Sequence, residues 1–252
     1  MRLLIVSDIH SNLEALQACL DAAPEFDRVV NLGDVVGYGA SPNEVTQACR
    51  EFTWIGVRGN HDKVCTGLET AEGFNPIAAV AAMWTRQVLA PENFQWLRNL
   101  PAGPLQPAEL PGLQLVHGSP LDEDQYMVSM PDATEALTRT PAHLTFFGHS
   151  HIQGAFYVNS DEGPWELRPG SRTGDKHEKH TVYLLAESKY LVNPGSLGQP
   201  RDGDWRAGFA IFDSGQHTVT FHRVPYDVKQ AQQRIRDAHL PDRLATRLGE
   251  GR

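Results

Sequence analysis

Cysteine is scarce in this chain of 252 residues, and its three cysteines, Cys19, Cys49 and Cys65, form no Cys-x-x-Cys pair. An odd number of cysteines without that spacing argues against a disulfide framework and against a zinc site built from thiolates. We expect reduced, mostly buried thiols that pack as small apolar side chains. A chain of this length can bury a sizeable core without covalent cross-links.

Long hydrophobic runs are also missing. No run approaches the roughly 20 apolar residues that a membrane-spanning helix needs. The N-terminus has only four apolar residues, 3–6, before Ser7 and Asp8, which is too few for the core of a signal peptide. We therefore expect a soluble, cytoplasmic protein with no membrane partner.

Basic residues are fewer than acidic ones: the chain has 22 Lys and Arg and 31 Asp and Glu, which gives a formal net charge of −9. Proteins that bind nucleic acids through phosphate contacts usually carry a basic face, so this balance argues against an extended nucleic-acid surface. Hydrophobic residues at 40%, with aromatics spread along the chain, argue against disorder.

What the chain does have is a repeated arrangement of five short apolar runs, each ending in Asp, Asn or His. The runs cover 3–7, 28–32, 54–57, 113–116 and 144–147. Capping boxes opening at Ser11 and Ser41 predict helices between the first three runs. Alternating strands and helices favour a largely parallel sheet, whose ligands gather outside the carboxyl ends of the strands.

The rest of the chain predicts a single domain over 1–252. We expect a helical insertion at about 63–112, with helices opening at Asn75-Pro76 and Pro91, and a helix over 131–137. The β-rich part at about 153–224 includes a polar loop, 168–180, that we expect to be mobile and near the site. An amphipathic helix is expected from about Val228.

The polar residues at the strand ends are the candidate metal ligands. Each motif alone has a structural explanation, because Asp-x-His and Asn-His-Asp are common as capping turns and a single His can be a satisfied core residue. Five strand ends that all carry N or O donors are better explained by one metal site. The donors exceed what one divalent ion can use and suffice for two ions. The seven candidates are Asp8, His10, Asp34, Asn60, His117, His149 and His151.

Together these motifs resemble the calcineurin-like metallophosphoesterase superfamily, with all five blocks in the family's order. The segment 193–201, Asn-Pro-Gly-Ser-Leu-Gly-Gln-Pro-Arg, resembles a later block of its small bacterial and archaeal phosphodiesterase branch. The resemblance implies an α/β (α+β) fold, a central β-sandwich of mixed sheets flanked by helices, with the metal site at the carboxyl ends of the strands.

The resemblance also implies residue roles. The first ion would be held by Asp8, His10 and His151, the second by Asn60, His117 and His149, and Asp34 would bridge the two. His61 would be the acid, or a donor to a phosphate oxygen, with Asp62 hydrogen-bonded to its other ring nitrogen and keeping it cationic. A hydroxide bridging the ions would attack phosphorus.

Metal identity is narrowed by the donor types. Imidazole, carboxylate and amide without thiolate suit Mn²⁺, Fe²⁺, Ni²⁺, Co²⁺ and Zn²⁺. Family habit makes Mn²⁺ the first candidate for both ions.

The chain departs from some relatives where a substrate phosphate would bind. Protein phosphatases and symmetric dinucleoside-tetraphosphate hydrolases of the superfamily carry Gly-Asp-x-Val-Asp-Arg-Gly, whereas residues 33–39 here lack that Arg, and their Asn-His-Glu ends in Asp62 here. This argues against a protein phosphatase. Arg58 or Arg201 could supply the cation instead, the alternative for each being a surface arginine.

The leading hypothesis is a metal-dependent phosphodiesterase or phosphatase acting on a small phosphate ester, for example a nucleotide. A non-catalytic protein-binding module on the same fold and a nucleotide-responsive regulator with weak hydrolysis are the alternatives. The pattern specifies neither a substrate base or sugar nor an oligomeric state.

Overall fold

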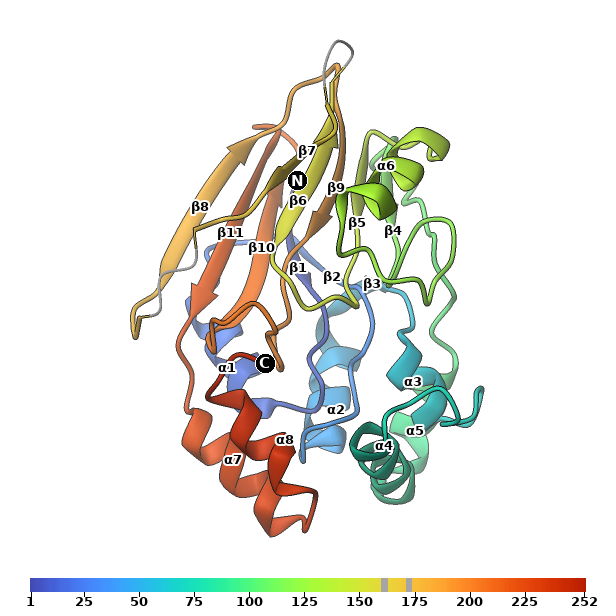
Figure 1. Ribbon diagram of the computed structural model, residues 1–252, viewed down its shortest axis with the longest axis vertical. Coiled ribbons are helices and arrows are strands. Elements are labelled where there is room, and N and C mark those ends of the chain that lie inside the picture. The colour runs from blue at the N-terminus through green and yellow to red at the C-terminus, as the bar shows by residue number, and fades with distance from the viewer. Residues whose placement is uncertain (160–162, 171–173) are drawn as a thin grey trace.

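Two β-sheets pack face to face in the computed structural model, which describes residues 1–159, 163–170 and 174–252 (Figure 1). The six-stranded sheet has the order β3 (Thr53–Gly56), β2 (Arg28–Asn31), β1 (Arg2–Val6), β10 (Ala207–Asp213), β11 (Thr218–Val224) and β8 (Glu178–Tyr183). The five-stranded sheet has the order β4 (Leu113–Leu115), β5 (Leu144–Phe146), β9 (Lys189–Asn193), β6 (Gly154–Val158) and β7 (Trp165–Leu167). β1, β2 and β3 are parallel, as are β4, β5 and β9.

The sandwich follows from the alternation of side chains along buried strands. In β1, Leu3 and Ile5 face the five-stranded sheet and join a core that includes Phe146 and Val192. The intervening Leu4 and Val6 face the helices and join the other large core. β1 is apolar on both faces because both faces are covered.

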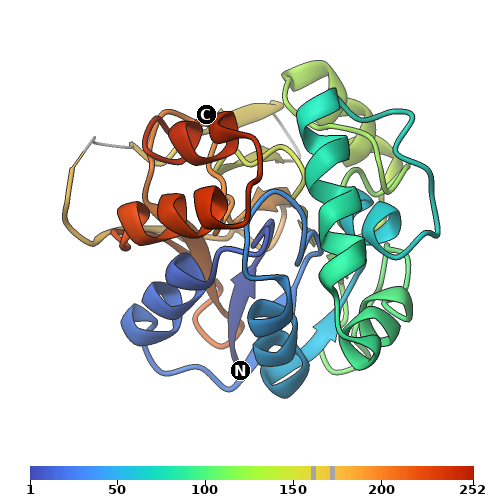
Figure 2. The same cartoon turned by 90° about the horizontal axis from the view of Figure 1, so that it is seen from below.

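Helices cover the outer faces of the two sheets. The helices on the side of the six-stranded sheet are α1 (Leu13–Ala22), α2 (Pro42–Phe52), α3 (Asn60–Cys65), α4 (Pro76–Val88), α5 (Pro91–Arg98), α7 (Val228–Asp237) and α8 (Asp242–Leu248). α6 (Met130–Arg139) covers the outer face of the five-stranded sheet. Seen from below, α7 lies beside α1 with α8 packed on α7, and α4 lies on the other side of the loops that follow the strands (Figure 2).

The predicted fold class is confirmed, and the five predicted strands appear as β1 to β5. The expected helices of the 63–112 segment appear as α4 and α5 and pack on the same core as α1 and α2. The three cysteines are free and buried. In the part of the chain that the structure describes, no helix is both long and apolar enough to cross a membrane.

The predicted N-cap residue of α1, Ser11, is wrong. Asn12, and not Ser11, caps α1 by accepting from the backbone N–H of Ala15 at 3.1 Å. Ser11 is in the left-handed region, at φ 54°, and its hydroxyl has no partner among the described residues. Ser41 does precede α2, but its side chain makes no capping bond.

Two predictions about loops and helix ends also need correction. Glu178–His180 belong to β8, so the predicted polar loop ends before them, and residues 171–173 of that loop lie outside the described chain. The single helix expected from Val228 is two helices, because the chain turns at His239, with φ 55°, and Pro241.

The capping assignment can be tested by replacing the neighbouring residues one at a time. Asn12→Ala removes the bond to Ala15 and a second one, from the Asn12 amide to the carbonyl of Gly198 at 2.9 Å. We expect a loss of about 2 kcal/mol in the free energy of unfolding, measured in urea. Ser11→Ala is the matched control and should change it by less than about 0.5 kcal/mol; a larger loss from Ser11→Ala would restore the sequence-based assignment.

Candidate metal centre

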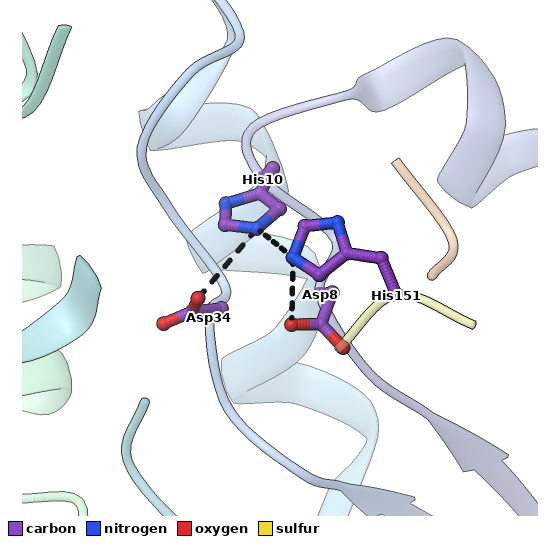
Figure 3. A group of neighbouring side chains, drawn as sticks. All are labelled: Asp8, His10, Asp34 and His151. Carbon is purple, nitrogen blue, oxygen red and sulfur yellow. Dashed lines mark hydrogen bonds and ion pairs between the residues drawn. The ribbon is translucent and has the colours of Figure 1, made fainter. Parts of the chain in front are cut away.

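The loops that follow the strands bring six of the seven predicted ligands into two overlapping groups. One group is Asp8, His10, Asp34 and His151, and the other is Asp34, His117 and His149. Within each group the ligand atoms lie within 4.8 Å of one another, and every residue is buried. Figure 3 shows the first group, with the four side chains converging from three loops.

Asp34 is the residue that both groups share. Its Oδ2 lies 3.6 Å from Nε2 of His10 and 3.5 Å from Nε2 of His117. The other oxygen, Oδ1, accepts from the backbone N–H of His61 at 2.8 Å. That bond orients the carboxylate so that one oxygen lies between the two groups.

The imidazoles of the first group present unprotonated nitrogens to the site. Nδ1 of His10 donates to the carbonyl of Val36 at 3.0 Å, and Nδ1 of His151 donates to the carbonyl of Gln199 at 2.6 Å. A neutral imidazole carries one proton, so each Nε2 is left with a lone pair. These two Nε2 atoms are 3.2 Å apart, and Nε2 of His151 is 3.2 Å from Oδ1 of Asp8.

The second group is built in the same way. Nδ1 of His117 donates to the carbonyl of Leu32 at 2.8 Å, and Nε2 of His149 donates to the carbonyl of Asp124 at 3.0 Å. The remaining nitrogens face each other at 3.1 Å. Oδ1 of Asn60, the seventh predicted ligand, is 3.3 Å from Nε2 of His117. Imidazole nitrogens and amide and carboxylate oxygens that converge in this way can bind a cation between them, so these side chains fit divalent metal ions.

The electrostatics of the site point the same way. Burial raises the pKa of the Asp34 carboxyl, but the attraction of the neighbouring imidazoles, His117 first, outweighs it, and the pKa is well below its ordinary value. Burial lowers the pKa of His117, yet Asp34 attracts a proton strongly enough to raise it to about 10. For His149, burial and His117 lower the pKa to about 3. A divalent ion would supply the positive charge that the proton on His117 otherwise supplies.

The backbone around the site is held in an uncommon conformation. Left-handed φ angles in residues other than glycine are rare and cost free energy. They occur here at Asp8, His10, Ser11, Asp34, Tyr38, His149 and His151. Among the described residues outside the site only His217 and His239 share this conformation. The strain therefore lies in the turns that aim the ligands.

Two glycines allow the loops to approach closely. A Cβ on Gly59 would lie 2.0 Å from Oδ1 of Asp34, and one on Gly148 would lie 2.0 Å from Oγ of Ser7. Gly59 has φ −102°, so the reason for glycine there is space and not a left-handed backbone. Any side chain at Gly59 would displace the shared carboxylate.

Hydrogen bonds from the end of β9 and the segment after it hold the loops of the site in place. Nδ2 of Asn193 donates to the carbonyl of Gly148 at 2.9 Å and to Oγ of Ser150 at 3.0 Å. The hydroxyl of Ser196 donates to the carbonyl of Asp8 at 2.8 Å. The 193–201 block, noted in the sequence for its resemblance, therefore fixes the loops that carry Asp8 and His149.

The predicted pairing of His61 with Asp62 is wrong. Asp62 accepts from the backbone N–H groups of Gly59 at 3.0 Å and Val36 at 3.2 Å, and so caps α3 and ties it to the loop after β2. Nδ1 of His61 has no partner among the described residues. Burial lowers the pKa of His61 to about 4, so the imidazole is neutral at pH 7 and is not kept cationic. The capping explanation, set aside in the sequence, holds for Asp62.

The two candidate arginines differ. Arg58 forms an ion pair with Glu123, with an Nη2 to Oε1 distance of 2.8 Å. Arg201 lies beside the ligand groups, because its backbone N–H donates to the carbonyl of His151 at 3.2 Å and its Nη2 donates to the hydroxyl of Tyr38 at 3.3 Å.

A cavity of about 260 Å³ opens beside the second group and is lined by Asn60, His61 and His149. Its walls include three aromatic residues that the sequence analysis missed. Tyr126 stacks on His149, and their ring centroids are 3.8 Å apart. The ring centroid of His61 is 4.5 Å from that of Phe74 and 4.3 Å from that of Tyr38. No motif marks these residues, since their positions depend on loops that fold back from distant segments.

Comparison with known proteins agrees with this geometry. The model of the calcineurin-like phosphoesterase superfamily domain matches residues 1–190. An uncharacterized protein of Methanocaldococcus jannaschii is 38% identical over 252 residues, covering 98% of this chain and 97% of its own length.

Solved structures show the same architecture. A metallophosphoesterase from Sphaerobacter thermophilus has 37% identity and a TM-score of 0.86, with 100% of this chain and 99% of that chain covered. A hypothetical protein from Pyrococcus horikoshii has 19% identity and a TM-score of 0.76, with 100% and 98% covered, and shows the fold alone. The chain therefore belongs to the calcineurin-like phosphoesterase superfamily.

Proposed function

We propose that this protein hydrolyses phosphate esters with two divalent metal ions, Mn²⁺ being the first candidate. The observation that carries the proposal is Asp34, whose Oδ2 lies about equally far from an imidazole nitrogen of each ligand group, at 3.6 and 3.5 Å. In this proposal Asp8, His10 and His151 would hold one ion, Asn60, His117 and His149 would hold the other, and both would share Asp34. When bound, the ions supply an activated water nucleophile and stabilise charge on the phosphoryl oxygens.

The chain's own residues would complete the reaction. His61 lines the cavity, and its imidazole is neutral in the free protein; the negative charge of a bound phosphate ester would raise its pKa, so that it would take up a proton and give it to the departing oxygen. Arg201 supplies a cation for a phosphoryl oxygen. Asp62 supports His61 only indirectly, by holding the start of α3.

The substrate we propose is a small phosphate ester, for example a nucleotide. A cavity of about 260 Å³ suits a small molecule, and the aromatic rings of Phe74 and Tyr126 can flank a planar group. The absence of the arginine found in protein phosphatases supports a small substrate over a protein.

Asp34→Asn tests the metal centre. The amide keeps the shape of the side chain but removes the charge that both ion sites share, so we expect metal content to fall from about two Mn²⁺ per chain to below one. Hydrolysis of bis-p-nitrophenyl phosphate should fall by more than about 100-fold. Elemental analysis and the chromogenic assay measure the two effects.

Asp21→Asn, which changes an exposed carboxylate on α1, is the matched control and should retain both properties. A wild-type chain that keeps well under one metal ion after Mn²⁺ loading and gentle purification would instead favour a non-catalytic binding module.

His61→Gln tests the proton donor through the leaving group. A p-nitrophenolate departs without protonation, whereas phenolate needs it more, so loss of a general acid should slow phenyl esters about 100-fold more than p-nitrophenyl esters. Metal content should remain at the wild-type value, which separates proton donation from metal binding. Equal loss on both esters would show that His61 binds phosphate without protonating the leaving group.

A further inference from the structure

Lys63, on α3, is the only buried lysine among the residues that the structure describes, and its side chain is 8% exposed. A desolvated ammonium group is costly unless carboxylates compensate it, and three lie within reach of its Nζ. Lys63 pairs with Asp124, and its Nζ is 3.1 Å from Oε2 of Glu69 and 3.5 Å from Oε1 of Glu123.

These carboxylates belong to the two segments that wall the cavity beside the second ligand group. Glu69 and Phe74 lie between α3 and α4, whereas Asp124 and Tyr126 lie between β4 and α6. All four residues line the cavity. The ammonium group of Lys63 therefore connects both walls to α3.

The second of these segments contacts the predicted ligand His149 at two points. The carbonyl of Asp124 accepts from Nε2 of His149 at 3.0 Å, and the ring of Tyr126 stacks on the imidazole. The bond to Asp124 sets the tautomer, since it places the proton on Nε2 and leaves a lone pair on Nδ1, which is 3.1 Å from Nε2 of His117. The position of one backbone carbonyl thus prepares His149 as a ligand.

Residues 119–125, which include that carbonyl, lie outside the helices and strands of the two sheets. Backbone bonds between Ser119 and Asp122, at 3.0 and 3.1 Å, fold the segment on itself. Side-chain ion pairs connect it to neighbouring segments, and the pair between Lys63 and Asp124 acts on the residue that carries the carbonyl.

We propose that Lys63 is a positioning residue for the second metal ion. Through Asp124, its ammonium group holds the carbonyl that fixes the tautomer and orientation of His149. This inference rests on the proposed function and deepens it. One short helix, α3, would then provide a ligand, Asn60, the proposed proton donor, His61, and the cation that orients a further ligand.

Lys63→Met tests this role, because it removes the charge and keeps an unbranched side chain. Asp124→Asn removes the charge of the partner. In both variants one of the two Mn²⁺ dissociation constants should rise about 10- to 100-fold, since groups that orient a ligating histidine affect metal affinity by this amount. The other should change by less than about threefold. Isothermal titration calorimetry measures both constants, and circular dichroism checks the fold.

Glu69→Gln is the matched control, because Glu69 and Asp124 are exposed to similar degrees, 50% and 41%, and contact the same ammonium group from different walls. It should leave both constants within about threefold of wild type. Lys63→Arg keeps the charge and should retain more affinity than Lys63→Met. Equal losses in Glu69→Gln and Asp124→Asn would show that Lys63 only neutralises carboxylates. Unchanged constants in Lys63→Met would likewise overturn the proposal.

The tautomer of His149 provides a readout that needs neither metal nor turnover. In long-range proton–nitrogen NMR spectra of the metal-free protein, wild type should show His149 protonated on Nε2 alone, and Lys63→Met should show both tautomers. A tautomer that depends on Lys63 in a protein that binds no Mn²⁺ would contradict the proposed function and leave the positioning of His149 by Lys63 standing. Two bound Mn²⁺ ions, with the same tautomer in wild type and Lys63→Met, would do the reverse.

Discussion

Crowding of imidazole nitrogens and carboxylates in a buried site is the constraint on which this structure depends. The Nε2 atoms of His10 and His151 are 3.2 Å apart, and Nε2 of His117 is 3.1 Å from Nδ1 of His149, with the carboxylates of Asp8 and Asp34 beside them. Left alone, such a cluster would be relieved by turning the imidazoles. Each imidazole is instead fixed by a bond to a backbone carbonyl, and three of the four residues, His10, His149 and His151, are held in a left-handed conformation. The surrounding fold thus keeps an arrangement that becomes favourable when cations bind.

The packing of the two sheets keeps the predicted ligands in these positions. Asp8, His10 and Asp34 follow strands of the six-stranded sheet, whereas His117, His149 and His151 follow strands of the five-stranded sheet. Their relative positions therefore depend on how the two sheets pack. The apolar layer between the sheets, with Leu3, Ile5 and Phe146 at 0% exposure, fixes that packing. A cluster of predicted ligands built across two sheets requires a tightly packed core, since protein interiors transmit small displacements.

Features that depend on neighbouring residues in the chain could be predicted from the sequence, whereas features that depend on distant segments could not. The convergence of the ligands was predictable, because parallel strands end side by side and each ligand directly follows its strand. The N-cap of α1 was not, because the left-handed turn at Ser11 belongs to the loop geometry of the site. Asp62 was misassigned for a related reason. A carboxylate three residues after Gly59 can cap a helix or orient His61, and only the folded loop after β2, with Val36 as a second donor, decides between them.

Contacts with the substrate depend on still longer-range structure. Arg58 and Arg201 are equivalent in the sequence, yet one pairs with Glu123 and the other reaches Tyr38. The loop carrying Arg201 is tied to the segment after α8 by the bond from the N–H of Gly203 to the carbonyl of Gly251, at 3.0 Å. Arg201 is therefore held in place by the C-terminal end of the chain. The strand-end motifs bring the predicted ligands together, whereas the position of the cation beside them depends on α8, which packs on α7 and through it on α1.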